Sequence, residues 1–454
     1  MKKSIKLFSS LIVLVMLFGT LAGCSMTKDA KPQAIADGKQ ISTNDLKSNI
    51  NKPDWIVVDT RINDAFNGWK LDGVKRGGHI KGATDFAANW LNVEAEDKDK
   101  KLAEILKVKG ITPEKKIVLY DANGKDAKEV VTYLTKNGFA NLYTYDVKQW
   151  ADNSSLAMES YPNYQMLVPA SWVADLIAGK KPETYSGNSF KLFEVSWGEE
   201  KNSYVKGHLP GAVHIDTDEE ESPPLWSLNS DEELIKFAEN NGITLDTTVV
   251  LEGEDPMAAY RVAAILKYLG VKDVRILNGG FNSWIREGYT VETTSNAKVA
   301  VADFGTKVPL NKGYIIGIDQ AKEILADKSN SILVDTRSRD EYIGKITGYK
   351  DLKFKGRPAG SVWGHAGSDP NHLEDYRNID NTMRNGSEIL AMWKEQGITP
   401  DKRLSFMCGS GWRAAEVMLY ADTMGVKSIS MYANGWYEWS ANPNNPVEIG
   451  EPKN

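Results

Sequence analysis

Of the two cysteines in this 454-residue chain, Cys24 and Cys408, the second lies in a pattern suited to covalent chemistry. It follows the apolar run 403–407 and begins the segment Cys408-Gly409-Ser410-Gly411-Trp412-Arg413. Glycines in such a loop permit positive φ and let backbone N–H groups turn toward the thiol. A helix is expected over 414–424, so the thiol would also lie at a helix N-terminus, which stabilises negative charge. We therefore predict that Cys408 is a thiolate nucleophile; the alternative is an inert core cysteine.

A similar local sequence occurs three times, so the loop that contains Cys408 can be compared with the equivalent loops of the other two repeats. Gly-Ile-Thr at 110, 242 and 397 leads each time into an expected strand, loop and helix, and gapless alignment places Asp121, Gly253 and Cys408 at one position. The first two loops lack a thiol and carry acids that would repel an anionic substrate. Pro256 also removes a backbone N–H donor from the second loop. We predict that the first two repeats are catalytically silent.

Further elements recur around each loop. Upstream, each repeat has a buried-looking strand, IVVDTR from Ile56, LFEVSW from Leu192 and ILVDTR from Ile332, followed by a glycine-flanked turn. Downstream come a helix, a glycine and another strand. Strands alternating with helices predict an α/β fold of mainly parallel sheets flanked by helices, with the loops at the carboxyl ends of strands. The length and the domain-sized repeat spacing predict three domains, at 41–160, 165–298 and 315–450.

The N-terminal segment has the pattern of a processing signal. Three lysines within the first six residues precede an apolar run over 7–18, and Leu21-Ala22-Gly23-Cys24 ends it. This resembles a bacterial lipoprotein signal, which implies removal of residues 1–23, a palmitate-type lipid on Cys24 and a polar tether over 24–40. The protein would then be anchored to the outer face of the bacterial membrane, in the cell envelope. The alternative is a plain secretory signal. Lipid on Cys24 would leave Cys408 without a disulfide partner, and an unpaired thiol outside the cytoplasm calls for a reason.

The composition and net charge limit the kinds of binding partner and cofactor that we expect. With 41% hydrophobic and 26% charged residues the chain is typical of soluble globular proteins. The formal net charge of −6, more negative still without the signal lysines, argues against nucleic acid or anionic lipid as a partner. The five histidines lack the spacing of metal ligands, so we expect no metal and no organic cofactor.

Taken together, these motifs resemble the rhodanese sulfurtransferase family. The VDTR strands, the GHxPGA-type turn at 207–212, the cysteine-terminated strand with its loop and the NGGFxxW segment at 278–284 carry the resemblance. It covers nearly the whole chain in three copies, as in three-domain bacterial envelope sulfurtransferases. The CGSGWR loop is more similar to that of 3-mercaptopyruvate sulfurtransferases than to the more basic loop of thiosulfate sulfurtransferases. The third turn departs from the pattern, with Arg357 where the other copies have histidine, and we assign no family role to it.

The resemblance implies a two-step reaction through a persulfide. The Cys408 thiolate would take the outer sulfur of a small anionic donor, 3-mercaptopyruvate or thiosulfate, and pass it to cyanide, a thiol or a protein. The loop residues Gly409, Ser410, Gly411 and Trp412 are expected to contact substrate. Arginines suit the acid group of the donor because they bind oxyanions with two hydrogen bonds. Arg413, in the loop, is the first candidate for this role, and Arg384 and Arg337 are further candidates.

Two other functions fit part of the pattern. A cysteine phosphatase uses a similar loop, but it needs five residues between cysteine and arginine, and here Gly409 to Trp412 supply four. A sulfur carrier or binding lipoprotein without rapid turnover would fit the two silent domains and the tether. The sequence leaves open the physiological donor and acceptor, the role of the silent domains and the oligomeric state.

Overall fold

The computed structural model describes residues 38–452, which belong to one compact unit. It contains three five-stranded sheets in which every pair of neighbouring strands is parallel. The predicted α/β fold with three domains is thereby confirmed. All three sheets have the same strand order, as expected for copies of one module.

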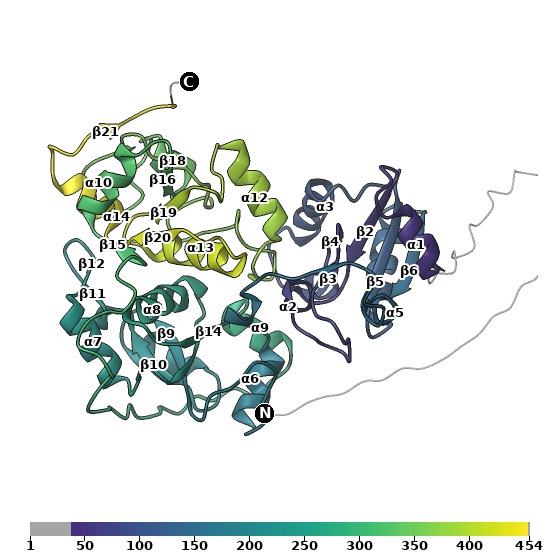
Figure 1. Ribbon diagram of the computed structural model, residues 1–454, viewed down its shortest axis with the longest axis horizontal. Helices are drawn as coiled ribbons and strands as arrows, with labels where there is room; N and C mark the ends of the chain where they lie inside the picture. Colours follow the sequence, from purple (N-terminus) through teal and green to yellow (C-terminus); the bar gives the residue numbers. More distant parts are fainter. Residues whose placement is uncertain (1–37, 453–454) are drawn as a thin grey trace, which may run out of the picture. The chain divides into compact units, whose positions relative to one another are not determined.

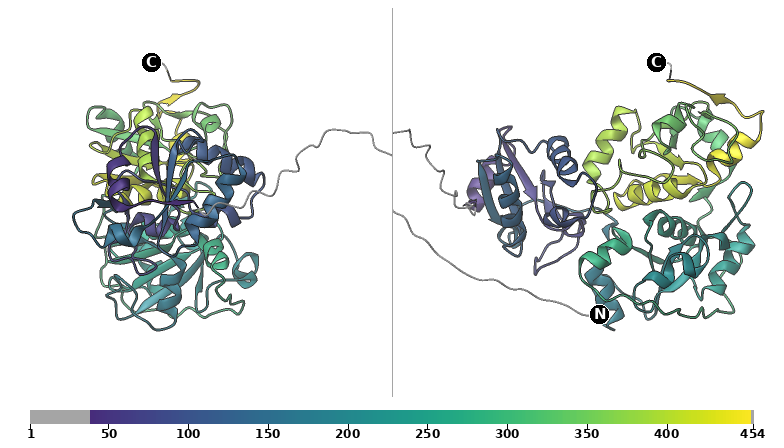
Figure 2. Two further views of the ribbon diagram at one scale, coloured as in Figure 1. Left: turned by 90° about the vertical axis from the view of Figure 1, so that its right-hand side faces the viewer. Right: turned by 180° about the vertical axis from the view of Figure 1, so that it is seen from behind.

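Domain 1 is a sheet with a hydrophobic core on each face. The strand order is β1 (Lys39–Gln40), β6 (Leu142–Asp146), β5 (Lys116–Asp121), β2 (Trp55–Asp59), β4 (Thr84–Asp85). Alternate residues of β5 serve opposite faces: Leu119 packs in one core with Leu134, and Val118 in the other with Leu46. Figures 1 and 2 show the helices on both sides of this sheet. These helices are α1 (Thr43–Asn49), α2 (Asn63–Asn67), α3 (Lys98–Val108), α4 (Asp126–Lys136) and α5 (Val147–Ala151). A small ribbon pairs β3 (His79–Ile80) with β7 (Met158–Glu159).

Domain 2 repeats this arrangement. Its sheet runs β10 (Val213–Asp216), β9 (Phe190–Ser196), β13 (Thr248–Glu252), β14 (Asp273–Leu277), β8 (Leu167–Val168). Its helices are α6 (Ala170–Ile177), α7 (Asp231–Asn240), α8 (Pro256–Leu269) and α9 (Gly280–Arg286). A hairpin of β11 (Glu221–Ser222) and β12 (Ser227–Leu228) is added between β10 and α7.

Domain 3 carries the cysteine-containing loop at its central strand. The order is β15 (Ile315–Ile316), β20 (Ile429–Tyr432), β19 (Arg403–Met407), β16 (Ser331–Asp335), β18 (Val362–Trp363). The helices are α10 (Ile318–Ala326), α11 (Arg339–Tyr342), α12 (Gly386–Glu395), α13 (Trp412–Thr423) and α14 (Gly435–Ala441). β17 (Arg357–Pro358) pairs with β21 (Val447–Glu448). The strand over 403–407 agrees with the sequence prediction, whereas α13 begins two residues earlier than expected.

Domains 2 and 3 share one hydrophobic core across helices α8 and α13. Val262 and Ala263 of α8 belong to the same buried cluster as Val417 and Leu419 of α13. The rings of Tyr260 and Tyr420 meet edge to face, with centroids 5.3 Å apart. Figure 1 shows the two helices side by side. This packing brings residues of domain 2 against the N-terminal end of α13, where the loop of domain 3 lies.

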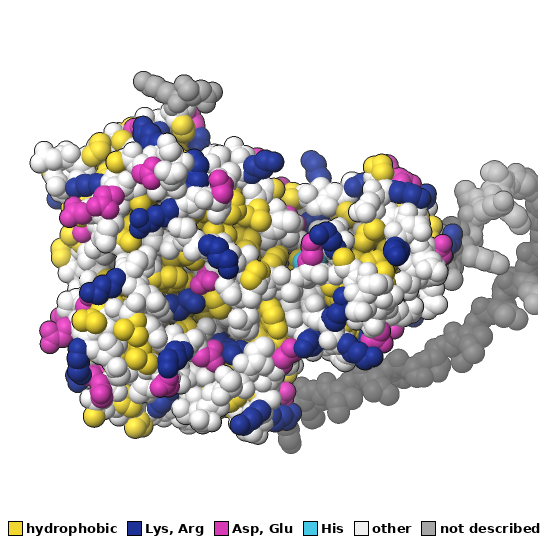
Figure 3. Space-filling view, in the orientation of Figure 1, with side chains coloured by type: hydrophobic (Ala, Val, Ile, Leu, Met, Phe, Trp, Pro, Cys, Tyr) yellow, Lys and Arg dark blue, Asp and Glu magenta, His cyan; other side chains and the backbone are white. Residues whose placement is uncertain are grey.

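The signal segment, Cys24 and most of the expected tether lie outside the described residues. None of the helices within 38–452 is long and apolar enough to cross a membrane. On the face shown in Figure 3, basic and acidic side chains are interspersed rather than gathered by sign.

Candidate active site

Cys408 lies directly after β19, in the middle of the domain 3 sheet, and begins the loop that leads into α13. Thr336 ties the end of this strand to β16, because both its N–H and its hydroxyl donate to the carbonyl of Met407, at 2.8 and 2.9 Å. The parallel sheet thus places the thiol at the carboxyl ends of its strands, where ligands bind in open α/β folds.

Two carbonyl groups of the loop accept hydrogen bonds from N–H groups of α14. Trp436 N–H donates to the carbonyl of Cys408 at 2.9 Å, and Tyr437 N–H donates to that of Gly409 at 3.1 Å. With these carbonyls bound to the N-terminal turn of α14, the loop is free to present its N–H groups to the thiol. Gly411 does so: its N–H donates to Cys408 Sγ at 3.2 Å.

The thiol is 1% exposed and lies at the N-terminus of the twelve-residue helix α13. The positive end of a helix dipole and a backbone N–H both favour an anion at Sγ. Within residues 38–452 Cys408 is the one cysteine, so no disulfide competes for it there. This geometry can hold a thiolate and, after sulfur transfer, a persulfide anion.

Both loop glycines are required, for different reasons. Gly411 has φ +101°, and a Cβ on it would lie 2.2 Å from Nη1 of Arg261 and 2.5 Å from the carbonyl of Ala433. Gly409 is not in the positive-φ region, but a Cβ there would lie 2.4 Å from the ring of Tyr349. The expectation of positive φ therefore holds at one of the two glycines, and close packing accounts for the other.

Arg413 lies in the loop as predicted, but its charge is matched by a buried carboxylate. Nη1 and Nη2 donate to the two carboxylate oxygens of Glu341 at 2.8 and 3.0 Å, and both side chains are at most 1% exposed. Nη2 also approaches the hydroxyl of Tyr349 at 3.3 Å. Burial acts to raise the pKa of Glu341, but the Arg413 guanidinium outweighs it and lowers that pKa below its ordinary value.

The other two candidate arginines are also paired. Arg337 donates to both oxygens of Asp335, with Nη2–Oδ2 at 2.7 Å, and stacks over Trp436. Arg384 donates from Nε to Glu388 at 2.7 Å and faces a 640 Å³ cavity that none of residues 408–413 lines. Their assignment to substrate stays a prediction, and no hydrogen bond seen in the structure joins them to the cysteine loop.

Ser410 is half-buried at the apex of the loop, and Trp412 reaches across to domain 2. The indole N–H of Trp412 donates to Oε1 of Glu221 at 2.9 Å. The other oxygen of Glu221 accepts from Nη2 of Arg261 at 3.2 Å. Residues of the second domain therefore form part of the surroundings of the cysteine loop.

Four residues near the loop were missed from sequence: Glu341, Tyr349, Glu221 and Arg261. Ser338 and Glu341 form a capping box, and the S-x-x-E spacing could have drawn attention to that glutamate. A charged residue at position 261, within the apolar helix α8, was a second signal. Nothing in the local sequence distinguishes Tyr349 or Glu221.

A family model described as "Rhodanese-like domain" matches residues 42–152, 170–287 and 318–442. The chain belongs to the rhodanese family. Thiosulfate sulfurtransferase YnjE of Escherichia coli is 40% identical over 396 residues, covering 87% of this chain and 89% of that protein. Sulfur carrier protein TtuD of Thermus thermophilus is 31% identical over 308 residues, 64% of this chain and 99% of that protein.

Among solved structures, the anaerobic ergothioneine biosynthesis enzyme of Chlorobium limicola, bound to trimethyl histidine as its natural substrate, is similar with a TM-score of 0.87 and 38% identity. The match covers 91% of this chain and all of that one. The similarity to thiosulfate sulfurtransferases supports sulfurtransferase as the class of activity of this three-domain rhodanese.

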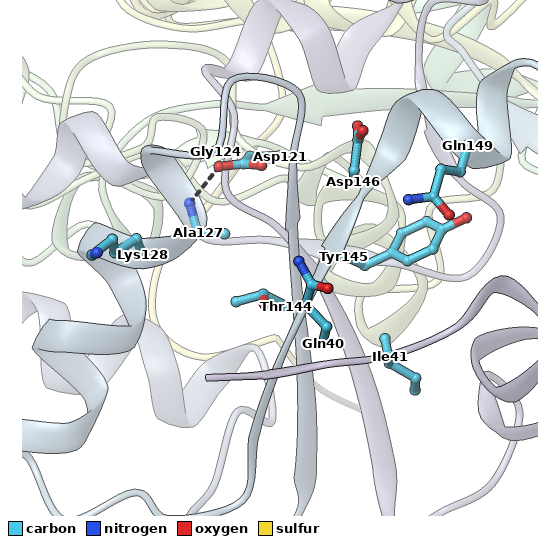
Figure 4. Close-up of a pocket in the computed structure, with 10 residues that line it drawn as sticks. All are labelled: Gln40, Ile41, Asp121, Gly124, Ala127, Lys128, Thr144, Tyr145, Asp146 and Gln149. Carbon is cyan, nitrogen blue, oxygen red and sulfur yellow. Dashed lines mark hydrogen bonds between the residues drawn. The ribbon is translucent and has the colours of Figure 1, made fainter. Parts of the chain in front are cut away.

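The first rhodanese domain has the carboxyl group of Asp121 at the position of the thiol. Oδ2 of Asp121 accepts from the N–H of Ala127, in the first turn of α4, at 3.0 Å, as Figure 4 shows. Burial raises the pKa of Asp121, while the N–H groups of Ala127 and Gly124 favour its charged form. A cavity of 320 Å³ beside it is also lined by Asp146. An anionic donor would meet like charge here, which supports the prediction that domain 1 is silent.

The second rhodanese domain has Gly253 at this position and a buried acid next to it. Glu252 is fully buried without a hydrogen-bond partner for either carboxylate oxygen among the described residues. Burial raises its pKa well above the ordinary value. Glu252 lines a 200 Å³ cavity with Glu194 and Glu254. This site, too, lacks a nucleophile and is unfavourable for an anion.

Proposed function

We propose that this protein moves sulfane sulfur from a small anionic donor, through a persulfide on Cys408, to a thiophilic acceptor. The observation that carries the proposal is the thiol itself, buried after the central strand, accepting the Gly411 N–H and facing the N-terminus of α13. The membership of all three domains in the rhodanese family gives the class of reaction.

The first step transfers one sulfur to the enzyme. With thiosulfate, the Cys408 thiolate attacks the outer sulfur, the S–S bond of the donor breaks, and sulfite leaves with the electron pair. With 3-mercaptopyruvate, the C–S bond breaks and the resulting pyruvate carbanion takes up a proton. In both cases the loop N–H groups and the helix dipole stabilise the anionic sulfur before and after transfer.

The second step returns the enzyme to its thiolate form. An acceptor nucleophile, such as cyanide, a small thiol or a protein thiol, attacks the terminal sulfur of the persulfide, and Cys408 leaves as a thiolate. The same electrostatic features that favour the thiolate make it a good leaving group. No metal or organic cofactor is needed for either step.

The donor is either thiosulfate or 3-mercaptopyruvate. Similarity to the thiosulfate sulfurtransferase YnjE supports the first. The CGSGWR loop, with one basic residue, supports the second. Gly409, Ser410, Gly411 and Trp412 would contact either donor, since they surround the thiol.

A second candidate acceptor is the imidazole ring of a trimethylated histidine. The similarity to the ergothioneine biosynthesis enzyme extends over nine-tenths of this chain. In addition, the half-buried indole of Trp412 lies in the cysteine loop. Aromatic faces are groups that bind quaternary ammonium ions.

Mass spectrometry of the purified protein after exposure to each donor tests the proposal. We expect one added sulfur on the peptide that contains Cys408, and none in a Cys408→Ser variant that is folded normally. Turnover by that variant, or sulfur on another residue, would refute the assigned nucleophile. Assays with cyanide, thiols and trimethyl histidine then identify the acceptor, and a persulfide that forms once but never turns over would indicate a carrier, the function named for TtuD.

We also propose a lipid anchor at Cys24, which would hold the enzyme at the outer face of the bacterial membrane. The support is the order of basic residues, apolar run and Leu-Ala-Gly-Cys in the sequence. With such an anchor the enzyme would act on donors and acceptors of the cell envelope.

A further inference from the structure

The arginines of domain 3 around the cysteine loop do not offer a free positive charge. Each is paired with a carboxylate of its own domain. The pairs are Arg413–Glu341, Arg337–Asp335, Arg377–Glu416 and Arg384–Glu388. An anionic sulfur held at Cys408 thus has backbone N–H donors near it, but its cationic neighbours in domain 3 are neutralised.

Arg261 of domain 2 is also paired with a carboxylate, but through one hydrogen bond, whereas Arg413 donates to both oxygens of Glu341 and leaves only Nε without a partner among the described residues. It is fully buried on α8, and its Nη2 donates to Glu221, but Nε and Nη1 have no hydrogen-bond partner among the described residues. Leaving two guanidinium donors buried and unsatisfied is costly unless a further group completes the site.

The unpartnered Nη1 lies against the cysteine loop. A Cβ built on Gly411 would be 2.2 Å from it, so the guanidinium packs directly on the residue whose N–H donates to Cys408 Sγ. Gly411 is thus the residue that the two groups share: its N–H is bonded to Sγ, and Nη1 lies where its side chain would be.

We propose that Arg261 is part of the active site, so that the silent domain 2 supplies the cation that favours the anionic sulfur at Cys408. This inference rests on the proposed function, and it assigns domain 2 a role in the reaction. Arg261 acts on the thiolate before transfer and on the persulfide after it. Glu221 positions the guanidinium and, through Trp412, joins it to the loop.

The other charged and titratable groups near the thiol are accounted for. Within domain 3, Glu341 neutralises Arg413, and Tyr349 stays uncharged because burial raises its pKa despite the nearby Arg413. From domain 2 come Glu220 and Glu221. Glu220 is fully buried with no partner for either oxygen among residues 38–452, and burial raises its pKa well above the ordinary value, although Arg261 acts to lower it. Of these two acids, Glu221 is the one that accepts a hydrogen bond from Arg261; burial raises its pKa, and Arg261 acts to lower it.

Two substitutions with opposite electrostatic signs test this role in the full-length protein. Both Arg261→Gln and Glu221→Gln weaken the Arg261–Glu221 pair, but the first removes a positive charge and the second a negative one. The readout is the rate at which the neutral reagent iodoacetamide alkylates Cys408, followed by peptide mass spectrometry at pH 7 and pH 9.5. Thiolate absorbance, taken as the difference from Cys408→Ser, gives an independent measure that does not depend on access of the reagent.

We expect Arg261→Gln to lower alkylation at pH 7 on the order of tenfold, with recovery at pH 9.5, where the thiol ionises without help. Glu221→Gln should react at least as fast as the wild type at pH 7. The control is Arg275→Gln, which removes another buried, ion-paired arginine of domain 2, on β14, and should leave alkylation unchanged.

Equal losses of alkylation rate in Arg261→Gln and Glu221→Gln would show that the Arg261–Glu221 pair only holds the structure together, and would overturn the inference. An unchanged alkylation rate in Arg261→Gln, or an equal loss in Arg275→Gln, would overturn it as well. If Arg261→Gln does not fold, Glu221→Gln decides: a slower reaction overturns the proposal and an equal or faster one supports it. Persulfide formation in the wild type is measured separately. Its absence would refute the proposed function without altering the alkylation result.

Discussion

Replacing Glu341 by glutamine should separate the stability of domain 3 from the reactivity of its thiol. The carboxylate makes two hydrogen bonds to Arg413, at 2.8 and 3.0 Å, and both side chains are at most 1% exposed. Removing one partner of a buried ion pair costs about 3–5 kcal/mol, because the other charge stays buried alone. Glutamine keeps an acceptor oxygen for Arg413 and Ser338, so we expect about 3 kcal/mol, or a melting temperature lower by on the order of 10 °C.

The reactivity of the Cys408 thiol should increase in the Glu341→Gln variant. In the variant the Arg413 guanidinium is no longer neutralised, and it lies close enough to Cys408 for the two to interact electrostatically. Alkylation of the thiol at pH 7 should therefore become severalfold faster, although the protein is less stable. Calorimetry and peptide mass spectrometry measure the two effects on the same samples.

Asp59→Asn is the matched control for this experiment. It breaks a pair of similar geometry in domain 1, where Arg61 donates to Asp59 at 2.9 and 2.6 Å and both residues are buried. It should destabilise domain 1 by a similar amount and leave the alkylation rate unchanged. The reasoning is refuted if Glu341→Gln melts like the wild type, or if its thiol reacts more slowly.

Three further predictions concern other parts of the molecule. Burial raises the pKa of Asp64 from 3.8 to about 7, so the protonated side chain stabilises the fold below about pH 4, and this stabilisation, on the order of 4 kcal/mol, is lost as the pH rises to 7. In urea unfolding, the Asp64→Asn variant should lack this part of the pH dependence of stability. Identical pH profiles for the variant and the wild type would contradict the prediction. Gly409→Ala should fold but lose about tenfold in persulfide formation, because the new methyl would displace the Tyr349 ring, whereas Gly313→Ala, with nothing within 4 Å, should have no effect. Cys24→Ala should move the protein from the membrane fraction to the soluble fraction, and continued membrane binding would argue for another anchor.

The fold and the position of Cys408 within it could be predicted because their signals are local. The Gly-Ile-Thr repeats mark three copies of one strand–loop–helix unit, and strands alternating with helices indicate parallel sheets. The position of Cys408 after the central strand follows from the same pattern, since the loop residues are consecutive. The helix boundary was off by two residues because Trp412 and Arg413 were assigned to the loop, although both have helical geometry.

The electrostatic partners could not be predicted because they are remote in sequence. Arg413 pairs with a residue 72 positions away, and Trp412 binds one that is 191 positions away in another domain. A loop arginine in sequence looks available to substrate; in the fold its charge is matched by Glu341. Which cations are free near the thiol depends on packing between α8 and α13, and no local pattern encodes that contact.

The three copies of the module differ in the side chain that lies at the start of the loop. A turn of inward N–H groups at a helix N-terminus favours an anion wherever it occurs. Domain 1 satisfies it with the carboxylate of Asp121, bound to the N–H of Ala127, which competes with any external anion. Domain 2 has no side chain at Gly253, and proline at the first position of α8 removes a donor. Domain 3 places a thiol there, which, unlike a carboxyl group, can take up a sulfur and release it, and this difference is the basis for proposing that one copy of the module turns over while the other two are silent.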